Sequence, residues 1–168
     1  MTVSSRPGFK FLLAHPAHLL ACGFGSGLAP FAPGTFGTLF GWLSFLVVEQ
    51  YLSGLSLLAF LLFAFVLGVS VCDRTGRTLG VIDHGSIVWD EIVPFWMVLA
   101  LTPPGWMWQL AAFLLFRLFD ITKPAPARYF DTRVKNGFGV MMDDLVAAFY
   151  TLLALALGKR LLEFSGLL

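Results

Sequence analysis

Residues 117–144, RLFDITKPAPARYFDTRVKNGFGVMMDD, place a dense group of charged side chains between two strongly apolar segments. The cations are Arg117, Lys123, Arg128, Arg133 and Lys135, and the carboxylates are Asp120, Asp131, Asp143 and Asp144. Charged residues make up only 12% of the chain, so this concentration sets the stretch apart. A carboxylate left unpaired beside an apolar segment is costly to desolvate, and ionisable residues in such places generally have a function. We therefore expect the fold to be organised around a site in this stretch.

The composition indicates a membrane protein. The chain is 58% hydrophobic with a mean hydropathy of +0.83, whereas soluble domains carry roughly 25% charged residues, about twice the fraction found here. Its 168 residues predict one domain, spanning 1–168. The net charge of +1 leaves no basic stripe, so no nucleic-acid partner is expected. The predicted fold class is an all-α, polytopic integral membrane protein.

About five helices are expected, some of them short or half-spanning. The segments are 35–48, 50–72, 92–101, 106–119 and 145–164. The second meets the roughly 20-residue length of a membrane span, while the third and fourth form a short helical hairpin. Thr35 is expected at or near the N-cap of the first. Before it, residues 11–22 resemble an interfacial segment, and the glycine- and proline-rich run up to Gly34 is expected to be irregular.

The charges also predict an orientation. With a cytoplasmic N-terminus, five spans place residues 73–91 and 117–143 on the cytoplasmic side, and these regions hold most of the Lys and Arg residues. That bias agrees with the positive-inside rule. Every polar cluster then lies on one face, as a single site requires. We expect the site to face the cytoplasm and the membrane itself to be a partner of the protein.

Two adjacent acidic pairs are the first candidates for metal ligands. They are Asp90-Glu91 and Asp143-Asp144, at the ends of apolar segments. Carboxylate oxygens suit Mg²⁺, which usually takes one or two carboxylates together with water and substrate phosphate. Asp120 and Asp83 are the next acidic candidates, and one carboxylate without metal would position or deprotonate the attacking water. The alternative is a buried ion-pair network that only holds short helices together.

Candidates for phosphate binding stand beside these carboxylates. Arg117 offers a bidentate fork and Lys123 a point charge, and both would stabilise negative charge on phosphoryl oxygens. A glycine-rich turn containing Gly34, Thr35 and Thr38 precedes a helix and would expose backbone N–H groups to an anion. Glycines there would equally permit close helix packing. The usual motifs of a covalent nucleophile are missing from the sequence, which favours water activated at a metal site.

Four motifs, in this order, resemble the signatures of the phosphatidylglycerophosphatase A family. They are PGTFGTL at 33–39, IVWDEIV at 87–93, FRLFDITKPAP at 116–126 and GFGVMMDDLVAA at 137–148. The resemblance implies a bacterial inner-membrane enzyme that uses Mg²⁺ to remove the terminal phosphate of a phospholipid, phosphatidylglycerophosphate. It also implies functional roles for Asp83, Asp90, Glu91, Asp120, Asp131, Asp143, Asp144, Arg117 and Lys123.

Two other classes of protein remain open at this point. A cation or proton-coupled transporter would use the same carboxylates along a pathway, although it predicts acidic residues in the middle of spans rather than at their ends. A non-catalytic membrane scaffold would use the charges only to pair with one another. The sequence leaves the oligomeric state undetermined, and a homo-oligomer is compatible with it.

Overall fold

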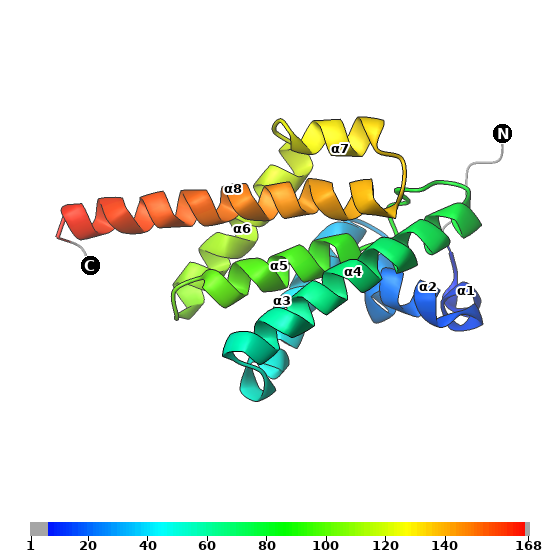
Figure 1. The fold of residues 1–168 in the computed structure, drawn as a ribbon, viewed down its shortest axis with the longest axis horizontal. Coiled ribbons are helices and arrows are strands. Elements are labelled where there is room, and N and C mark those ends of the chain that lie inside the picture. Colours follow the sequence, from blue (N-terminus) through cyan, green and yellow to red (C-terminus); the bar gives the residue numbers. More distant parts are fainter. Residues whose placement is uncertain (1–6, 167–168) are drawn as a thin grey trace.

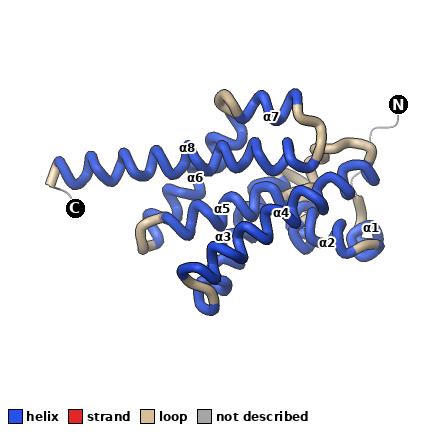
Figure 2. Tube along the Cα trace, in the orientation of Figure 1, coloured by secondary structure: helices blue, strands red, loops and turns tan. Residues whose placement is uncertain are grey.

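The computed structural model describes residues 7–166, and all regular structure within that range is helical (Figures 1 and 2). The elements are α1 Phe9–Ala14, α2 Pro16–Ala21, the 3-10 helix η1 Gly23–Leu28, α3 Pro33–Tyr51, α4 Gly54–Leu79, α5 Trp89–Leu101, α6 Trp106–Thr122, α7 Ala127–Arg133 and α8 Gly137–Phe164. The all-α prediction is confirmed. Each of the five expected helical segments overlaps one of α3, α4, α5, α6 and α8.

The start of α3 differs from the prediction. Ala32 is the N-cap residue and Pro33 is the first helical residue, so Thr35 lies within the first turn rather than at the cap. Proline is favoured at this position because its fixed φ suits the helix and its missing N–H would have no partner there anyway. Thr35 is therefore near the N-cap, as the expectation allowed, but it does not cap the helix itself.

The segment between α6 and α8 is more helical than predicted. The predicted helical segments leave residues 120–144 without a helix, but α7 forms there and α8 begins at Gly137, eight residues before the expected start. The Asn136 side chain caps α8 by accepting a hydrogen bond from the Gly139 N–H at 3.0 Å. Asp143 and Asp144 consequently lie in the second turn of α8, inside a regular helix.

Helix α5 forms the centre of the molecule. Ten of its 13 residues are buried, and it packs against α3, α4 and α8. Ile92, Val93 and Phe95 are completely buried. A short helix that is apolar on almost all sides must be surrounded by other helices, and this central place fixes the acidic residues of its first turn relative to the other helices.

The polar ends of the long helices meet at one end of the bundle. Consecutive helices alternate in direction, so the starts of α3, α5 and α8 lie with the ends of α4 and α6 (Figure 1). One contact of this kind joins α8 to α4, where the Gly137 N–H donates to Asp73 Oδ1 at 3.1 Å. The predicted convergence of polar segments is thus present in the fold.

Two of the described helices, α4 and α8, have the length and hydropathy expected of a membrane span. Both expose large apolar side chains along much of their length, including Leu58, Leu62 and Val66 in α4. Helix α8 does the same with Leu157 and Leu161. An outward-facing apolar surface of this size is typical of membrane association.

The crossing of α8 over α4 gives the first prediction. Gly137→Ala should destabilise the fold, because an added Cβ would lie 1.9 Å from the carbonyl oxygen of Val69. The Val69 oxygen belongs to the backbone and cannot rotate away, so a helix must move, and overpacking of this kind costs about 1–3 kcal/mol. Thermal unfolding in detergent micelles should show a lower melting temperature.

Gly158→Ala is the matched control on the same helix. Nothing lies within 4 Å of a Cβ added at Gly158. Alanine is the better helix former, so this variant should be as stable as the wild type or slightly more stable. Equal melting temperatures for the two variants would contradict the close approach of α8 to α4.

Candidate active site

Arg117 connects three helices at the polar end of the bundle. Its Nη1 lies 2.9 Å from Glu91 Oε1 in α5 and 2.5 Å from Asp120 Oδ2 in its own helix, α6. It also donates to Thr38 Oγ1 in α3 at 3.3 Å. Only 14% of the arginine side chain is exposed. The guanidinium is therefore a fixed, buried positive charge, as a phosphate-binding or structural arginine requires.

Glycine in α3 makes room for this arrangement. A Cβ at Gly34 would lie 1.9 Å from Glu91 Oε1, and one at Gly37 would lie 2.9 Å from Glu91 Oε2. The Thr38 hydroxyl donates to the Gly34 carbonyl oxygen at 2.9 Å, which orients its oxygen to accept from Arg117. Two roles were considered for these glycines, anion binding and close helix packing. The contacts with the Glu91 carboxylate support close packing. Thr35 is half-buried in the same first turn of α3.

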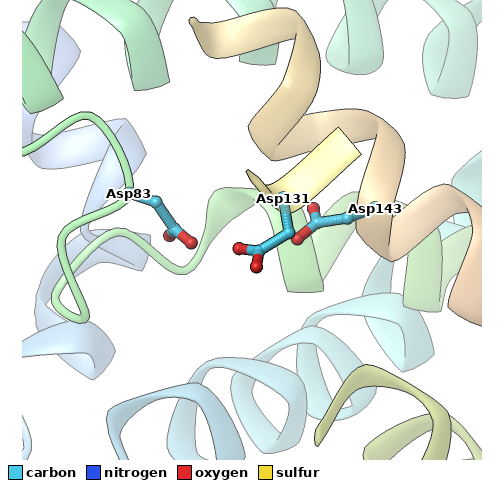
Figure 3. A group of neighbouring side chains, drawn as sticks. All are labelled: Asp83, Asp131 and Asp143. Carbon is cyan, nitrogen blue, oxygen red and sulfur yellow. The ribbon is translucent and has the colours of Figure 1, made fainter. Parts of the chain in front are cut away.

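A second cluster surrounds Lys123. Its Nζ lies 2.7 Å from Asp143 Oδ2, 2.8 Å from Asp131 Oδ1 and 3.9 Å from Asp83 Oδ2. These three carboxylates come from α8, α7 and the loop between α4 and α5, and point toward one another (Figure 3). Each offers an oxygen within 4.8 Å of the others. We call Asp83, Asp131 and Asp143 the acidic triad.

The backbone at Lys123 has a left-handed conformation. Lys123 is the C-cap residue of α6, with φ +43° and ψ 63°, and its N–H donates to the Phe119 carbonyl oxygen at 2.9 Å. This conformation costs a residue other than glycine roughly 1–2 kcal/mol. The turn sends the chain away from α6 at Pro124, and the ion pairs of the side chain offset part of the strain.

The electrostatics of this cluster are coupled through Lys123. Burial disfavours the charged form of Lys123, but attraction to Asp143 and Asp131 outweighs it and raises the lysine pKa above its usual value. Burial also raises the pKa of Asp83, against the opposing effect of Lys123. For Asp131, burial is again the largest influence, but the hydrogen bond from Lys123 and further attraction to cations leave its pKa lowered. Formal charges of −3 on the triad and +1 on Lys123 leave −2, which a divalent cation would balance.

Three further carboxylates lie deeper. Asp90, Glu91 and Asp144 are 6%, 9% and 3% exposed, and each has one buried oxygen without a hydrogen-bond partner among the described residues. Asp144 interacts electrostatically with Asp120, Asp143, Asp90 and Glu91. Buried carboxylate oxygens without partners are unfavourable in the absence of a cation. These hard oxygen donors therefore suit Mg²⁺.

The structure distributes the predicted metal ligands over two clusters. Asp143 joins the acidic triad, whereas Asp90, Glu91 and Asp144 form the deeper group beside Arg117 and Asp120. Asp131 was implied by the family resemblance but not chosen as a site residue from its chemistry. It lies in α7, a helix that the sequence did not predict. Its position eight residues after Lys123 did not indicate a contact between the two side chains, because a turn separates them and they share no helix.

Comparison with known proteins identifies the family. Residues 19–159 match the family described as phosphatidylglycerophosphatase A. The chain belongs to this family. A relative of that name from Haemophilus influenzae is 49% identical over 150 residues, covering 89% of this chain and 92% of the relative. Another of that name from Escherichia coli is 44% identical over 144 residues, covering 82% and 80%. This member of the family is an enzyme, a phosphatase.

A third relative carries a different name. It comes from Bacteroides thetaiotaomicron, is 38% identical over 149 residues, and is provisionally named a phosphatidylinositol-3-phosphatase. The match covers 84% of this chain and 92% of that relative. No solved structure matches the chain.

The packing of α3 against Glu91 gives the second prediction. Gly34→Ala should lower phosphatase turnover, because the new Cβ displaces Glu91 Oε1 from Arg117 Nη1. A misplacement of about 1 Å near reacting groups can lower rates by roughly 100-fold, so a loss of at least about 10-fold is expected. Phosphate release by the purified variant measures it.

Gly85→Ala is the control for this variant. Gly85 lies in the loop between α4 and α5, near Asp83, and nothing lies within 4 Å of an added Cβ. Its turnover should equal that of the wild type. Full activity of Gly34→Ala would mean that the contact between Glu91 and Arg117 is not needed for the reaction.

Proposed function

We propose that the chain is a Mg²⁺-dependent lipid phosphatase of the bacterial inner membrane. Its substrate is phosphatidylglycerophosphate, and hydrolysis of the terminal phosphomonoester gives phosphatidylglycerol and inorganic phosphate. Family membership and the names of two relatives support the substrate. The observation that carries the proposal is the meeting of buried carboxylates with Arg117 and Lys123 at one end of an apolar helix bundle.

The residues that would hold Mg²⁺ are the predicted ligands Asp90, Glu91, Asp143 and Asp144, together with the rest of the acidic triad. Their fit rests on the unpartnered oxygens of Asp90, Glu91 and Asp144 and on the triad's closely spaced carboxylates. Bound Mg²⁺ supplies positive charge that stabilises the phosphoryl oxygens as hydrolysis proceeds. The burial of Asp90, Glu91, Asp143 and Asp144 keeps bulk water away from these four ligands and strengthens that electrostatic effect.

The reaction transfers the phosphoryl group from the lipid hydroxyl to water. A water oxygen attacks phosphorus, the bond from phosphorus to the glycerol oxygen breaks, and that oxygen gains a proton. Arg117 and Lys123 are proposed to stabilise charge on the phosphoryl oxygens, with Gly34, Thr35 and Thr38 beside them in α3. Asp83 and Asp120 are the candidates for the carboxylate that accepts the proton from water. Asp83 belongs to the acidic triad that would hold Mg²⁺, so Asp120, beside Arg117 Nη1, is the candidate that remains for this role.

An apolar groove supports a lipid as the substrate. It has a volume of about 550 Å³ and includes Pro126, Met142, Leu145 and Phe149 in its lining. No residue of the acidic triad lines the groove, which extends along the bundle from Pro126 and Met142 to Leu101 at the end of α5. An acyl chain in this groove would keep the headgroup phosphate near the charged end of the bundle.

Phosphate release from the purified protein provides the third prediction. Mixed micelles containing phosphatidylglycerophosphate should give release with Mg²⁺ and none with a chelator. Asp144→Asn should lower turnover by about 100-fold or more, because a buried ligand and its charge are lost. Glu163→Gln removes the same charge at the far, exposed end of α8 and should retain full activity.

Several outcomes separate the possible functions. Release from phosphatidylinositol 3-phosphate but not from phosphatidylglycerophosphate would overturn the proposed substrate and keep the phosphatase. Release that persists in chelator would overturn the metal requirement. Absence of release from folded protein with any lipid phosphomonoester would favour the transporter or scaffold interpretation of the same carboxylates.

The orientation in the membrane gives a fourth prediction. Arg128→Cys lies on the exposed surface of α7, at the polar end of the bundle, and Trp106→Cys lies at the opposite end, at the start of α6. A membrane-impermeant thiol reagent should label Arg128→Cys only in inverted vesicles and Trp106→Cys only in intact spheroplasts. The native Cys22 and Cys72 are buried and should contribute little labelling. The reverse pattern would place the site outside the cytoplasm.

A further inference from the structure

We propose that the Lys123 ammonium is an internal cation that occupies the acidic triad until a divalent metal ion binds, and that it then moves to the substrate phosphate. The inference rests on the proposed metal-dependent function. The inference adds one step to that function, the exchange of the Lys123 ammonium for the metal ion. Lys123 and the metal compete for the same carboxylate oxygens. Lys123 is then a mobile residue, unlike Arg117.

The contacts of Lys123 support this competition. Its Nζ donates hydrogen bonds to Asp131 Oδ1 at 2.8 Å and to Asp143 Oδ2 at 2.7 Å, and Asp83 Oδ2 lies 3.9 Å away. The three carboxylates that could bind a metal together are therefore those already gathered around one ammonium. Mg²⁺ binds oxygen at about 2.0–2.1 Å and needs near-octahedral geometry, which leaves no room for an ammonium between the same oxygens. Metal binding and the present position of Lys123 exclude each other.

Charge favours the exchange. The triad carries a formal −3 and Lys123 contributes +1, so the cluster keeps −2 while the lysine occupies it. Replacing the ammonium by a divalent cation leaves −1, and the ammonium remains close by to balance the rest. A lysine ammonium is a point charge on a flexible four-carbon stem, so it can leave the cluster without a change in the backbone.

The fold keeps the released ammonium at the site. Lys123 is anchored at the left-handed end of α6, six residues after Arg117, with its ammonium on the triad. A phosphate entering beside the metal brings negative charge to this position. Lys123 therefore has two alternative anionic partners, carboxylates before metal binding and phosphate oxygens after it.

The two neighbouring cations, Arg117 and Lys135, do not have two alternative anionic partners of this kind. Arg117 is held by Glu91, Asp120 and Thr38 together, so it has no single partner to exchange. Lys135 binds the backbone carbonyl of Asp131 rather than a triad carboxylate. It nevertheless lies close enough to act electrostatically on Asp83 and Asp131. Lys135 is thus a matched control that changes the local charge without occupying the triad.

Isothermal titration of the purified protein with Mg²⁺ in detergent, without lipid, tests the exchange. A competing group lowers the apparent affinity by the fraction of molecules in which the site is open. Lys123→Met opens the site permanently and should bind Mg²⁺ at least about 10-fold more tightly, whereas Lys135→Met should change affinity by less than about 3-fold. Lys123→Arg should bind about 10-fold more weakly, because its guanidinium fork holds carboxylates by two hydrogen bonds.

Turnover and stability provide independent measurements. Lys123→Met should bind metal tightly yet release phosphate slowly, since the phosphate loses its ammonium partner. Its melting temperature should fall in chelator, where the triad is not neutralised, and recover in Mg²⁺ by more than that of the wild type. This recovery also tests the proposal if the metal-free variant folds poorly.

The outcomes distinguish this proposal from the proposed function. Equal Mg²⁺ affinity in Lys123→Met and Lys135→Met, with Mg²⁺-dependent activity in the wild type, would overturn the exchange and leave the phosphatase intact. Weaker Mg²⁺ binding in Lys123→Met than in the wild type would also overturn the exchange. It would show that Lys123 stabilises the metal site rather than competing with the metal. Absence of Mg²⁺ binding in the wild type and in every variant would overturn the exchange and the proposed metal site together.

Discussion

The burial of acidic side chains in an apolar bundle is the constraint on which this structure depends. Asp90, Glu91, Asp143 and Asp144 are each at least nine-tenths buried, and isolated charges in such surroundings are strongly unfavourable. The protein offsets this cost only in part, through Arg117 and the lysine of the second cluster. The remaining negative charge suits a divalent cation, which the proposed function requires at this end of the bundle.

Close approach of the helices keeps this charged region in a fixed geometry. Gly34 lets α3 reach the Glu91 carboxylate, and Gly137 lets α8 pack directly on α4. Between them, α5 carries its acidic first turn into the centre of the bundle. The same small residues that allow helices to pack in membranes therefore position the carboxylates, so stability and site geometry rest on the same contacts.

The sequence predicted the helical class, the gathering of polar segments at one end, and the family. It misjudged two local boundaries: the Asn136 cap lets α8 begin at Gly137, before the apolar run, and Pro33 begins α3 before Thr35. It also predicted no helix in the region of α7. That helix carries few apolar residues of its own, and it is supported by packing on α8, which a local pattern does not report.

The sequence by itself determined which chemical groups are present: an apolar, all-helical chain, hard oxygen ligands, and two cations beside them. Only the tertiary structure decided their partners. Asp83, Asp131 and Asp143 are far apart along the chain, and they meet because a loop, α7 and α8 converge on the left-handed turn at Lys123. Arg117 pairs with Asp120 three residues on in its own helix, but its other acidic partner, Glu91, comes from α5 through the tertiary fold. The choice between these partners depends on helix crossings and turn geometry, which act over distances that the spacing of residues in the sequence does not encode.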